Sequence, residues 1–280
     1  MTEDTEVKTT ETAETPLTAE PVAEPTPETP APGATGNGVN SGNKTKGVCD
    51  IVFLLDATGS MQPAIDDLKS NIKLFFKQLS AADANGGAVV KDWRARVVGY
   101  RDVLVDGEWY IDNPFTRDPA EIEKQLDALK AIGGGDEPES LLDALYKVVK
   151  VGSTPKCAQL EDPTKWRYRS EAARIVIVFS DASFHAKTSL SEASGLDWQE
   201  IANLIMQEKI RLSIYAPQMP CYDDLSQIDK CEYMPIEFDS EIPNDPVYKL
   251  RDFTADTANF QKTLEQLAKT VSVSAVAEVL

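Results

Sequence analysis

The stretch Cys49–Met61, with the sequence CDIVFLLDATGSM, decides the fold of this chain. It begins with a near-continuous apolar run, Ile51–Leu55, which is typical of a β-strand covered on both faces. The run stops at a carboxylate, Asp56, and two hydroxyl side chains follow at alternate positions, Thr58 and Ser60. These oxygens stand at the carboxyl end of the expected strand, where open α/β sheets bind their ligands. Oxygen donors without nitrogen or sulfur favour Mg²⁺, Mn²⁺ or Ca²⁺ over zinc or copper.

Strands and helices are expected to alternate through the rest of the chain. Further strands are predicted at Trp93–Tyr100, Arg174–Ser180 and Arg211–Ala216, with a short edge strand at Glu108–Asp112. Helices are predicted from Met61, from Asp118, from Asp136, at Asp197–Glu208 and at Asp256–Thr270. The proline-containing segment Pro217–Tyr248 is interpreted as irregular. This alternation, mostly without hairpins, predicts an α/β fold: a doubly wound, mostly parallel sheet flanked by helices in a Rossmann-like arrangement.

Composition divides the chain into three parts. Residues 1–46 are rich in Thr, Glu, Pro and Ala and have no aromatic residue. They bury too little apolar surface to offset the entropy of ordering, so we expect a disordered acidic tail and linker. Residues 47–270 are long enough for one domain with a sizeable core. Residues 271–280 are expected to form a C-terminal tail.

The acidic composition argues against several classes of partner. The chain has 46 acidic and 28 basic residues and a net charge of −18. Nucleic acid and anionic membranes both need a cationic surface, so neither is an expected partner. No apolar run approaches the roughly 20 residues of a membrane-spanning helix, and no secretory signal is visible, so we expect no membrane insertion and a cytoplasmic location. Cys221 and Cys231 would pair only in an oxidising compartment and are interpreted as free thiols.

Three acidic turns are predicted to meet at one edge of the sheet. Asp56 and Asp181 each follow an apolar strand, and Asp136–Glu139 opens a predicted helix. Acidic residues at a helix start are also favoured by the helix dipole, so simple capping is an alternative interpretation of Asp136–Glu139. Carboxylates that gather repel one another unless a cation lies between them. A divalent ion would satisfy all three turns.

These segments resemble a von Willebrand factor type A domain, whose metal-ion-dependent adhesion site has the motif Asp-x-Ser/Thr-x-Ser. The motif corresponds here to Asp56, Thr58 and Ser60. The sequence is most similar to the subclass of integrin β subunits and bacterial relatives, which has a glycine-rich turn before Asp-x-Pro-Glu and a strand ending in Asp-Ala-x-x-His. The corresponding segments are Gly133–Glu139 and Asp181–His185. The resemblance extends over roughly residues 47–270.

The resemblance implies how the ligands of the first and third turns would act. Thr58 and Ser60 would coordinate the ion directly, and Asp56 and Asp181 would bind it largely through water. The expected ion is Mg²⁺, with Mn²⁺ or Ca²⁺ as alternatives.

The second turn departs from the pattern of most family members, which place a threonine there. In the subclass that this sequence resembles, the ligand is the glutamate. Glu139 is therefore the expected ligand, and Asp136 is the alternative. A third carboxylate neutralises more of the cation, so it should hold the ion more firmly and leave less charge to attract an acidic partner.

The leading functional hypothesis is a non-catalytic module whose metal ion binds an Asp or Glu of a partner protein. One alternative is a metal-dependent hydrolase or phosphotransferase, since Mg²⁺ with carboxylates also serves phosphoryl transfer. Against it, the sequence lacks a phosphate-cradling loop, and the negative charge repels phosphorylated substrates. The other alternative is a structural subunit of an ATPase or kinase complex with a vestigial site.

The remaining polar and aromatic residues near these segments have simpler interpretations. His185, the single histidine, is expected to orient the Asp181 loop by hydrogen bonding. Arg101 and Asp102 either line the rim of the site or form a surface ion pair. Trp109 is a candidate for an exposed contact residue, whereas the other three tryptophans are expected to pack internally.

Overall fold

The computed structural model describes residues 47–81, 90–134, 137–236, 262 and 265–272. Several predicted features fall wholly or partly outside these ranges: the tail 1–46, residues 237–248 of the segment Pro217–Tyr248, much of the last helix Asp256–Thr270, most of the C-terminal tail 271–280, and Asp136.

A six-stranded sheet forms the centre of the described structure, with the order β3-β2-β1-β4-β5-β6. All neighbouring strands are parallel except β3, which is antiparallel to β2. The strands are β1 Val48–Asp56, β2 Asp92–Tyr100, β3 Tyr110–Asp112, β4 Ala173–Phe179, β5 Ile210–Pro217 and β6 Glu232–Ile236. β1 lies between β2 and β4. Its carboxyl end is therefore flanked by the ends of two neighbouring strands.

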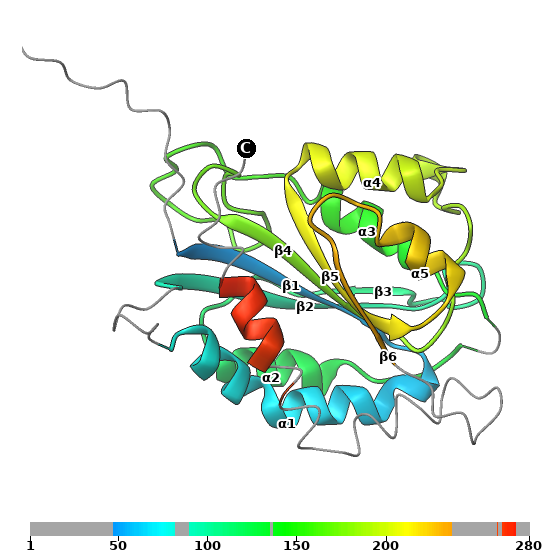
Figure 1. Cartoon of the computed structure of the whole chain (residues 1–280), viewed down its shortest axis with the longest axis horizontal. Coiled ribbons are helices and arrows are strands. Elements are labelled where there is room, and N and C mark those ends of the chain that lie inside the picture. The colour runs from blue at the N-terminus through cyan, green and yellow to red at the C-terminus, as the bar shows by residue number, and fades with distance from the viewer. Residues whose placement is uncertain (1–46, 82–89, 135–136, 237–261, 263–264, 273–280) are drawn as a thin grey trace, which may run out of the picture. The chain divides into compact units, whose positions relative to one another are not determined.

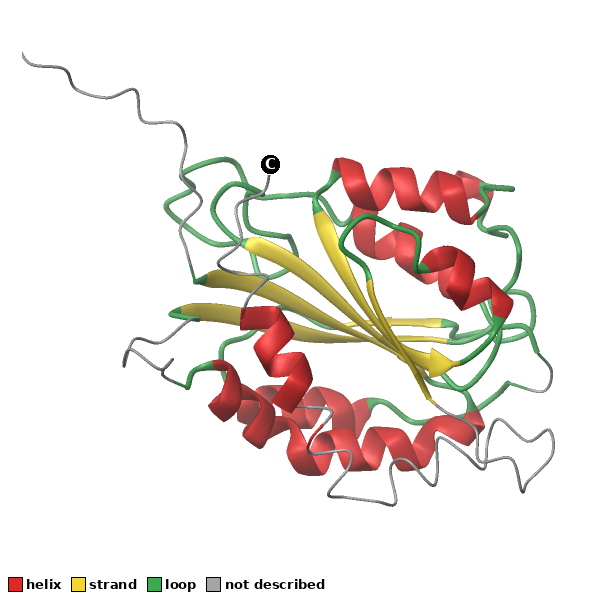
Figure 2. Ribbon diagram, viewed as in Figure 1, coloured by secondary structure: helices red, strands yellow, loops and turns green. Residues whose placement is uncertain are grey.

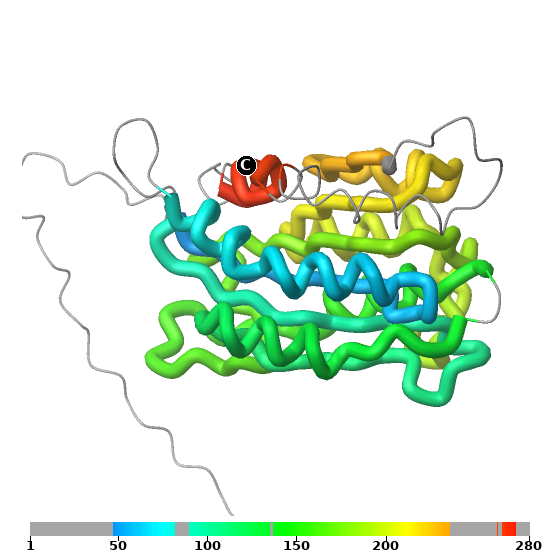
Figure 3. The backbone as a smooth tube through the Cα atoms, turned by 90° about the horizontal axis from the view of Figure 1, so that it is seen from below, coloured from blue at the N-terminus to red at the C-terminus, as the bar shows by residue number. Residues whose placement is uncertain are grey.

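Helices cover both faces of this sheet (Figures 1 and 2). One face carries α1 Gln62–Leu79, α2 Pro119–Ala128 and the helical residues 265–272. The other carries α3 Leu141–Lys150, α4 Trp198–Gln207 and α5 Pro220–Leu225, and the short helices η1 Gly59–Met61 and η2 Ser191–Ala193 lie in connecting segments. Seen from below, α1 and α2 run side by side across the sheet (Figure 3). The predicted α/β fold with a mostly parallel sheet is confirmed.

β1 contributes to two separate cores because successive residues of a strand point to opposite faces. Phe53 packs edge-to-face on Phe75 of α1, with ring centroids 5.4 Å apart. Val52 and Leu54 belong to the opposite core, together with residues of α3, α4 and α5. All of these side chains are fully buried, which accounts for the continuous apolar run in the sequence.

The interpretation of Pro217–Tyr248 as irregular is wrong for its first half. Its described residues contain both α5 and β6, and β6 pairs with β5 in parallel. Two of the prolines occupy positions that regular structure tolerates. Pro220 is the first residue of α5, where a missing N–H costs nothing, and Pro235 lies in the edge strand β6.

The helix at the end of the described chain extends slightly beyond the predicted domain boundary. Residues 265–272 include helical positions past residue 270, and Val271 is fully buried in the core cluster that also contains the apolar residues of α1. The described chain contains no helix of sufficient length and apolarity to cross a membrane. Its four cysteines, Cys49, Cys157, Cys221 and Cys231, are free thiols.

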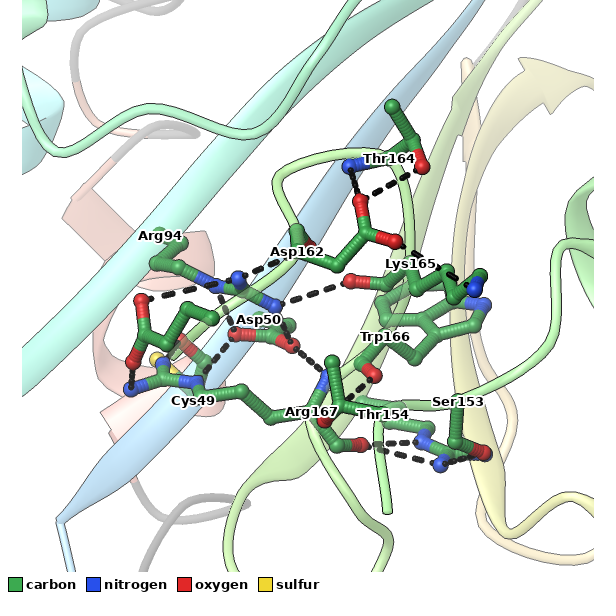
Figure 4. Close-up of polar contacts among 12 residues, drawn as sticks. Cys49, Asp50, Arg94, Ser153, Thr154, Asp162, Thr164, Lys165, Trp166 and Arg167 are labelled. Carbon is green, nitrogen blue, oxygen red and sulfur yellow. Dashed lines mark hydrogen bonds and ion pairs between the residues drawn. The ribbon is translucent and has the colours of Figure 1, made fainter. Parts of the chain in front are cut away.

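A buried carboxylate, Asp50, organises the amino ends of the central strands (Figure 4). Asp50 is inaccessible to solvent and accepts hydrogen bonds from Arg94 Nη2 at 2.7 Å and from Arg167 Nε at 2.7 Å. The backbone N–H of Arg167 donates to the same carboxylate at 2.7 Å. Since Arg167 belongs to the segment 151–172 between α3 and β4, these bonds hold that segment against β1 and β2.

Substituting Asp50→Asn should destabilise the domain strongly, because it removes the buried carboxylate that the guanidinium groups of Arg94 and Arg167 share. We expect the free energy of unfolding, measured by urea titration, to fall by about 3–5 kcal/mol. Glu121→Gln is the control, since Glu121 forms an exposed pair with Lys124 one turn along α2 and should change stability by less than about 0.5 kcal/mol. Equal effects of the two substitutions would contradict the structural role of Asp50.

Candidate metal-binding site

The turn after β1 holds the first group of candidate ligands. Asp56 is the last residue of β1 and is fully buried. Thr58 donates twice to Asp56 Oδ1, from its backbone N–H at 2.9 Å and from its hydroxyl at 2.7 Å. Because that hydroxyl gives its proton to Asp56, its lone pairs remain available to a cation. Ser60 follows, half-buried within η1.

The end of β4 brings a second group of oxygens to the same place. β4 pairs with β1 up to Leu55 and Phe179, so the residues after both strands lie together. The Ser180 hydroxyl donates to Asp56 Oδ2 at 2.9 Å, and Asp181 is 3% exposed. Sequence reasoning missed Ser180. The available signal was a hydroxyl directly after an apolar strand and directly before a candidate ligand.

Glu139 reaches the site from the loop before α3. Its N–H donates to the Ser183 carbonyl at 2.9 Å, and its own carbonyl accepts from the His185 N–H at 2.9 Å, which joins this loop to the one after β4. The side chain is 3% exposed, and its Oε2 atom is buried with no hydrogen-bond partner in the described part of the chain. A Cβ atom at Gly134 would lie 2.5 Å from Thr58 Cβ and 3.1 Å from Glu139 Oε1. A glycine is therefore needed where the two candidate ligands approach each other.

The prediction that the acidic segment forms the first turn of a helix is wrong. α3 begins at Leu141, and its N-cap Ser140 makes no side-chain capping hydrogen bond. Glu139 instead pairs with the loop after β4, so helix capping does not account for it. The acidic residue in the first turn is Asp143, which accepts from two backbone N–H groups of another loop. Asp136, the alternative ligand, lies outside the described residues.

Burial and mutual repulsion raise the pKa values of the gathered carboxylates. Burial, and after it the charge of Asp181, raise the pKa of Asp56 to about 7 against the hydrogen bonds that it accepts. The pKa of Glu139 is raised to about 8, first by burial and then by the charges of Asp56, Asp102, Asp106 and Asp181. Among the described residues, the largest influences on these two pKa values include no cationic side chain. Burial and like charge thus make the ionised forms of both carboxyl groups costly in the described structure.

Asp102 and His185 form a hydrogen-bonded group beside the site. Asp102 Oδ1 accepts from the Ser140 hydroxyl at 3.0 Å and from the Leu104 N–H at 2.9 Å, and it lies 3.2 Å from His185 Nε2. The histidine therefore attaches the loop after β4 to the loop after β2. The sequence does not indicate Asp102 as the partner, because the two residues are 83 positions apart.

The interpretation of Arg101 and Asp102 as a surface ion pair is wrong, since both side chains are buried. The Arg101 guanidinium donates instead to three backbone carbonyls: Ala57 at 3.1 Å, Lys130 at 2.9 Å, and Glu108. We call these three contacts the Arg101 clamp. They join the turn after β1 to the loops after β2 and after α2. The sequence shows no signal for this role, because the acceptors are main-chain atoms.

The donor set suits a hard cation, because it consists of hydroxyl and carboxylate oxygens. No three or more His, Cys, Asp or Glu side chains among the described residues are close enough together to hold a metal ion by themselves. An ion here would need the hydroxyls of Thr58 and Ser60, and water, to complete its coordination. The buried Glu139 Oε2 fits that requirement, since it is an acceptor without a donor among the residues described.

Two solved structures are similar to this chain at low sequence identity. The pilus adhesin SpaC from Lactobacillus rhamnosus GG is 11% identical with a TM-score of 0.48, over 82% of this chain and 31% of its own. The chain thus spans less than a third of that adhesin. The SpRpn10 VWA domain is 12% identical with a TM-score of 0.43, over 73% of this chain and 93% of its own. No curated protein matches the sequence.

The match to a protein family is more extensive. Residues 50–266 match the von Willebrand factor type A domain, a range that contains most of the sheet and the loops of the candidate site. The predicted resemblance to this family is therefore confirmed, whereas the assignment to the subclass of integrin β subunits and bacterial relatives stays a prediction. This chain belongs to the von Willebrand factor type A domain family.

Proposed function

We propose that this domain is a metal-dependent protein-binding module, in which a divalent cation beside β1 binds an acidic side chain of a partner protein. The observation that carries the proposal is the buried Glu139 Oε2, which has no hydrogen-bond partner among the described residues and lies in the field of Asp56. A buried carboxylate oxygen without a donor or counter-charge is costly. A cation between Glu139 and Thr58 would remove that cost. Membership of a family of commonly metal-dependent interaction modules supports the same function.

The residues present would divide the coordination between direct and water-mediated contacts. Thr58 and Ser60 would contribute hydroxyl oxygens, and Glu139 would contribute Oε2. Asp56 and Asp181 would act through water. We propose Mg²⁺ as the ion, with Mn²⁺ or Ca²⁺ as substitutes, since all three accept oxygen ligands.

The proposed module is non-catalytic. A cation held from one side by protein groups keeps positions open, and when bound it supplies a positive charge that attracts a carboxylate. The net charge of −18 opposes the approach of multiply charged anionic substrates such as phosphate esters. A single acidic side chain on an otherwise neutral or basic partner meets much less repulsion.

Removing either close ligand should weaken metal binding. We expect Thr58→Ala and Glu139→Gln each to weaken magnesium affinity at least about tenfold, measured by isothermal titration calorimetry. Thr164→Ala is the matched control, because Thr164 donates to Asp162 from its N–H at 2.9 Å and its hydroxyl at 2.6 Å in the same Asp-x-Thr geometry on the surface. Unchanged affinity in both site variants would refute this assignment of ligands.

The raised pKa values of Asp56 and Glu139 predict a pH-dependent stability in EDTA. A carboxyl group whose pKa is raised by folding binds its proton more tightly in the folded protein than in the unfolded chain. The protonated group therefore adds to the free energy of unfolding. This contribution is complete below about pH 4 and is lost as the pH rises through the folded-state pKa values of about 7 and about 8. Mg²⁺ should oppose this loss, so its stabilisation in thermal melts should be larger at pH 8.5 than at pH 5.

Glu139→Gln serves as the comparison for that measurement, since it removes one of the two titrating groups. The loss of stability between pH 5 and pH 8.5 in EDTA should be smaller in this variant than in the wild-type protein. Identical pH profiles of the two proteins would show that Glu139 does not titrate in this range.

Partner binding should depend on the metal. We expect the immobilised full chain to retain a protein from native lysate in MgCl₂ and to lose it in EDTA, and Asp56→Ala to lose it in both buffers. Thr164→Ala should behave as the wild type does. A partner that is retained equally in all conditions would contradict metal-dependent binding and would favour a structural subunit instead.

A further inference from the structure

Aliphatic side chains are exposed beside the candidate metal site. Five large hydrophobic side chains are exposed in the described part of the chain: Leu104, Val105, Ile132, Leu160 and Met206. The first three, at 65%, 61% and 56% exposure, lie in the two loops that border the site. Isolated exposed aliphatic residues are ordinary, whereas three in two adjoining loops make this edge the candidate interaction surface of the described structure. We call these three residues the aliphatic rim.

The two loops lie side by side at the end of β1. The carboxylate of Asp106 leaves no room for a side chain at Gly133, so the loops are in contact at this point. Val105 and Ile132 are the preceding neighbours of these two residues. The Ile132 N–H also donates to the Ala57 carbonyl at 3.0 Å, in the turn that carries the candidate ligands.

The backbone of the aliphatic rim is fixed by buried polar groups. The Leu104 N–H donates to Asp102 Oδ1 at 2.9 Å, and the Arg101 clamp holds both loops to the turn after β1. A surface that is already ordered loses less conformational entropy when a partner binds. Trp109, the contact candidate from the sequence, is half-buried and packs against Tyr110 instead.

The charges around the aliphatic rim restrict what can lie beside the metal-binding acid. Asp106 and Glu108 lie in the loop after β2, and Glu137 and one cationic residue, Lys130, lie in the loop after α2. Further acidic residues on a partner would meet predominantly like charge, whereas aliphatic side chains can bury the exposed surface without an electrostatic penalty.

We propose that the partner is a protein segment with Leu, Ile or Val within two positions of its metal-binding Asp or Glu, and that the aliphatic rim receives this side chain. The inference rests on the proposed function, because the cation sets the position of the acidic residue. It adds a second determinant of specificity, an aliphatic side chain, to the acidic side chain that binds the metal.

A random 12-residue peptide library displayed on phage would test the inference with the full chain as the bait. Selection in MgCl₂, with elution by EDTA, should enrich peptides that contain Asp or Glu. Among these peptides, Leu, Ile or Val within two positions of the acid should be enriched at least about fivefold over the unselected library, since burying one aliphatic side chain changes affinity by about tenfold or more.

Two variants separate the contributions. Substituting L104S, V105S and I132S together should abolish the aliphatic preference and weaken a selected peptide about tenfold, while magnesium affinity and the acidic preference remain. The combination of L160S with M206S is the matched control, since it removes exposed aliphatic residues from the segment 151–172 and from α4 and should leave both preferences intact.

The outcomes distinguish this inference from the function on which it rests. Magnesium-dependent enrichment of acidic peptides with no aliphatic preference, or with a preference that survives the triple substitution, would overturn the inference and leave the proposed function standing. Selection without any magnesium-dependent acidic enrichment would overturn both.

Discussion

The burial of a carboxylate at each end of β1 is the constraint on which the rest of this structure depends. Asp50 and Asp56 are both inaccessible to solvent, on a strand whose intervening residues are entirely apolar. At the amino end, Arg94 and Arg167 supply the counter-charge. At the carboxyl end, Asp56 accepts hydrogen bonds only from hydroxyl and amide groups among the described residues. Because a buried ion needs compensation, the charge at the amino end is balanced by protein groups, and the carboxyl end is the place where we propose that a cation binds.

The sheet topology brings further polar loops to the Asp56 end of β1, where the candidate metal site lies. Parallel pairing of β1 with β2 and β4 places three connecting loops at one edge, and the bridge between Glu139 and Phe184 adds the loop before α3. The acidic side chains approach closely enough to raise one another's pKa values, as Asp181 does for Asp56. The same edge presents the exposed loops that a partner would contact. Metal binding and partner recognition are therefore expected to share one rigid framework.

Much of this arrangement was predictable from periodicity and strand-end chemistry. Apolar runs indicated β1, β2, β4 and β5, and the parallel fold implied that residues following β1 and β4 would meet. The roles of Arg94 and Arg167 were not predictable, because their shared partner Asp50 lies more than forty positions away from either. The same holds for Ser180, whose role depends on its exact register beside Asp56. Local patterns reveal elements, whereas contacts between distant segments depend on packing.

The segment after β5 was interpreted as irregular because it contains several prolines, which is a local pattern that does not report packing. A proline count does not distinguish the first turn of a helix or an edge strand from an irregular loop, and Pro220 and Pro235 occupy those two permitted positions.

The Arg101 clamp has a consequence for how such a domain can diversify. One side chain fixes the main chain of three loops that are far apart in the sequence, so no single loop has its own independent conformation. Transplanting one loop from another protein onto this scaffold would leave unfilled guanidinium donors and would shift the two remaining loops. We expect a change of binding preference to require substitution of outward-facing side chains on the existing loop backbones. The alternative is replacement of all three loops together.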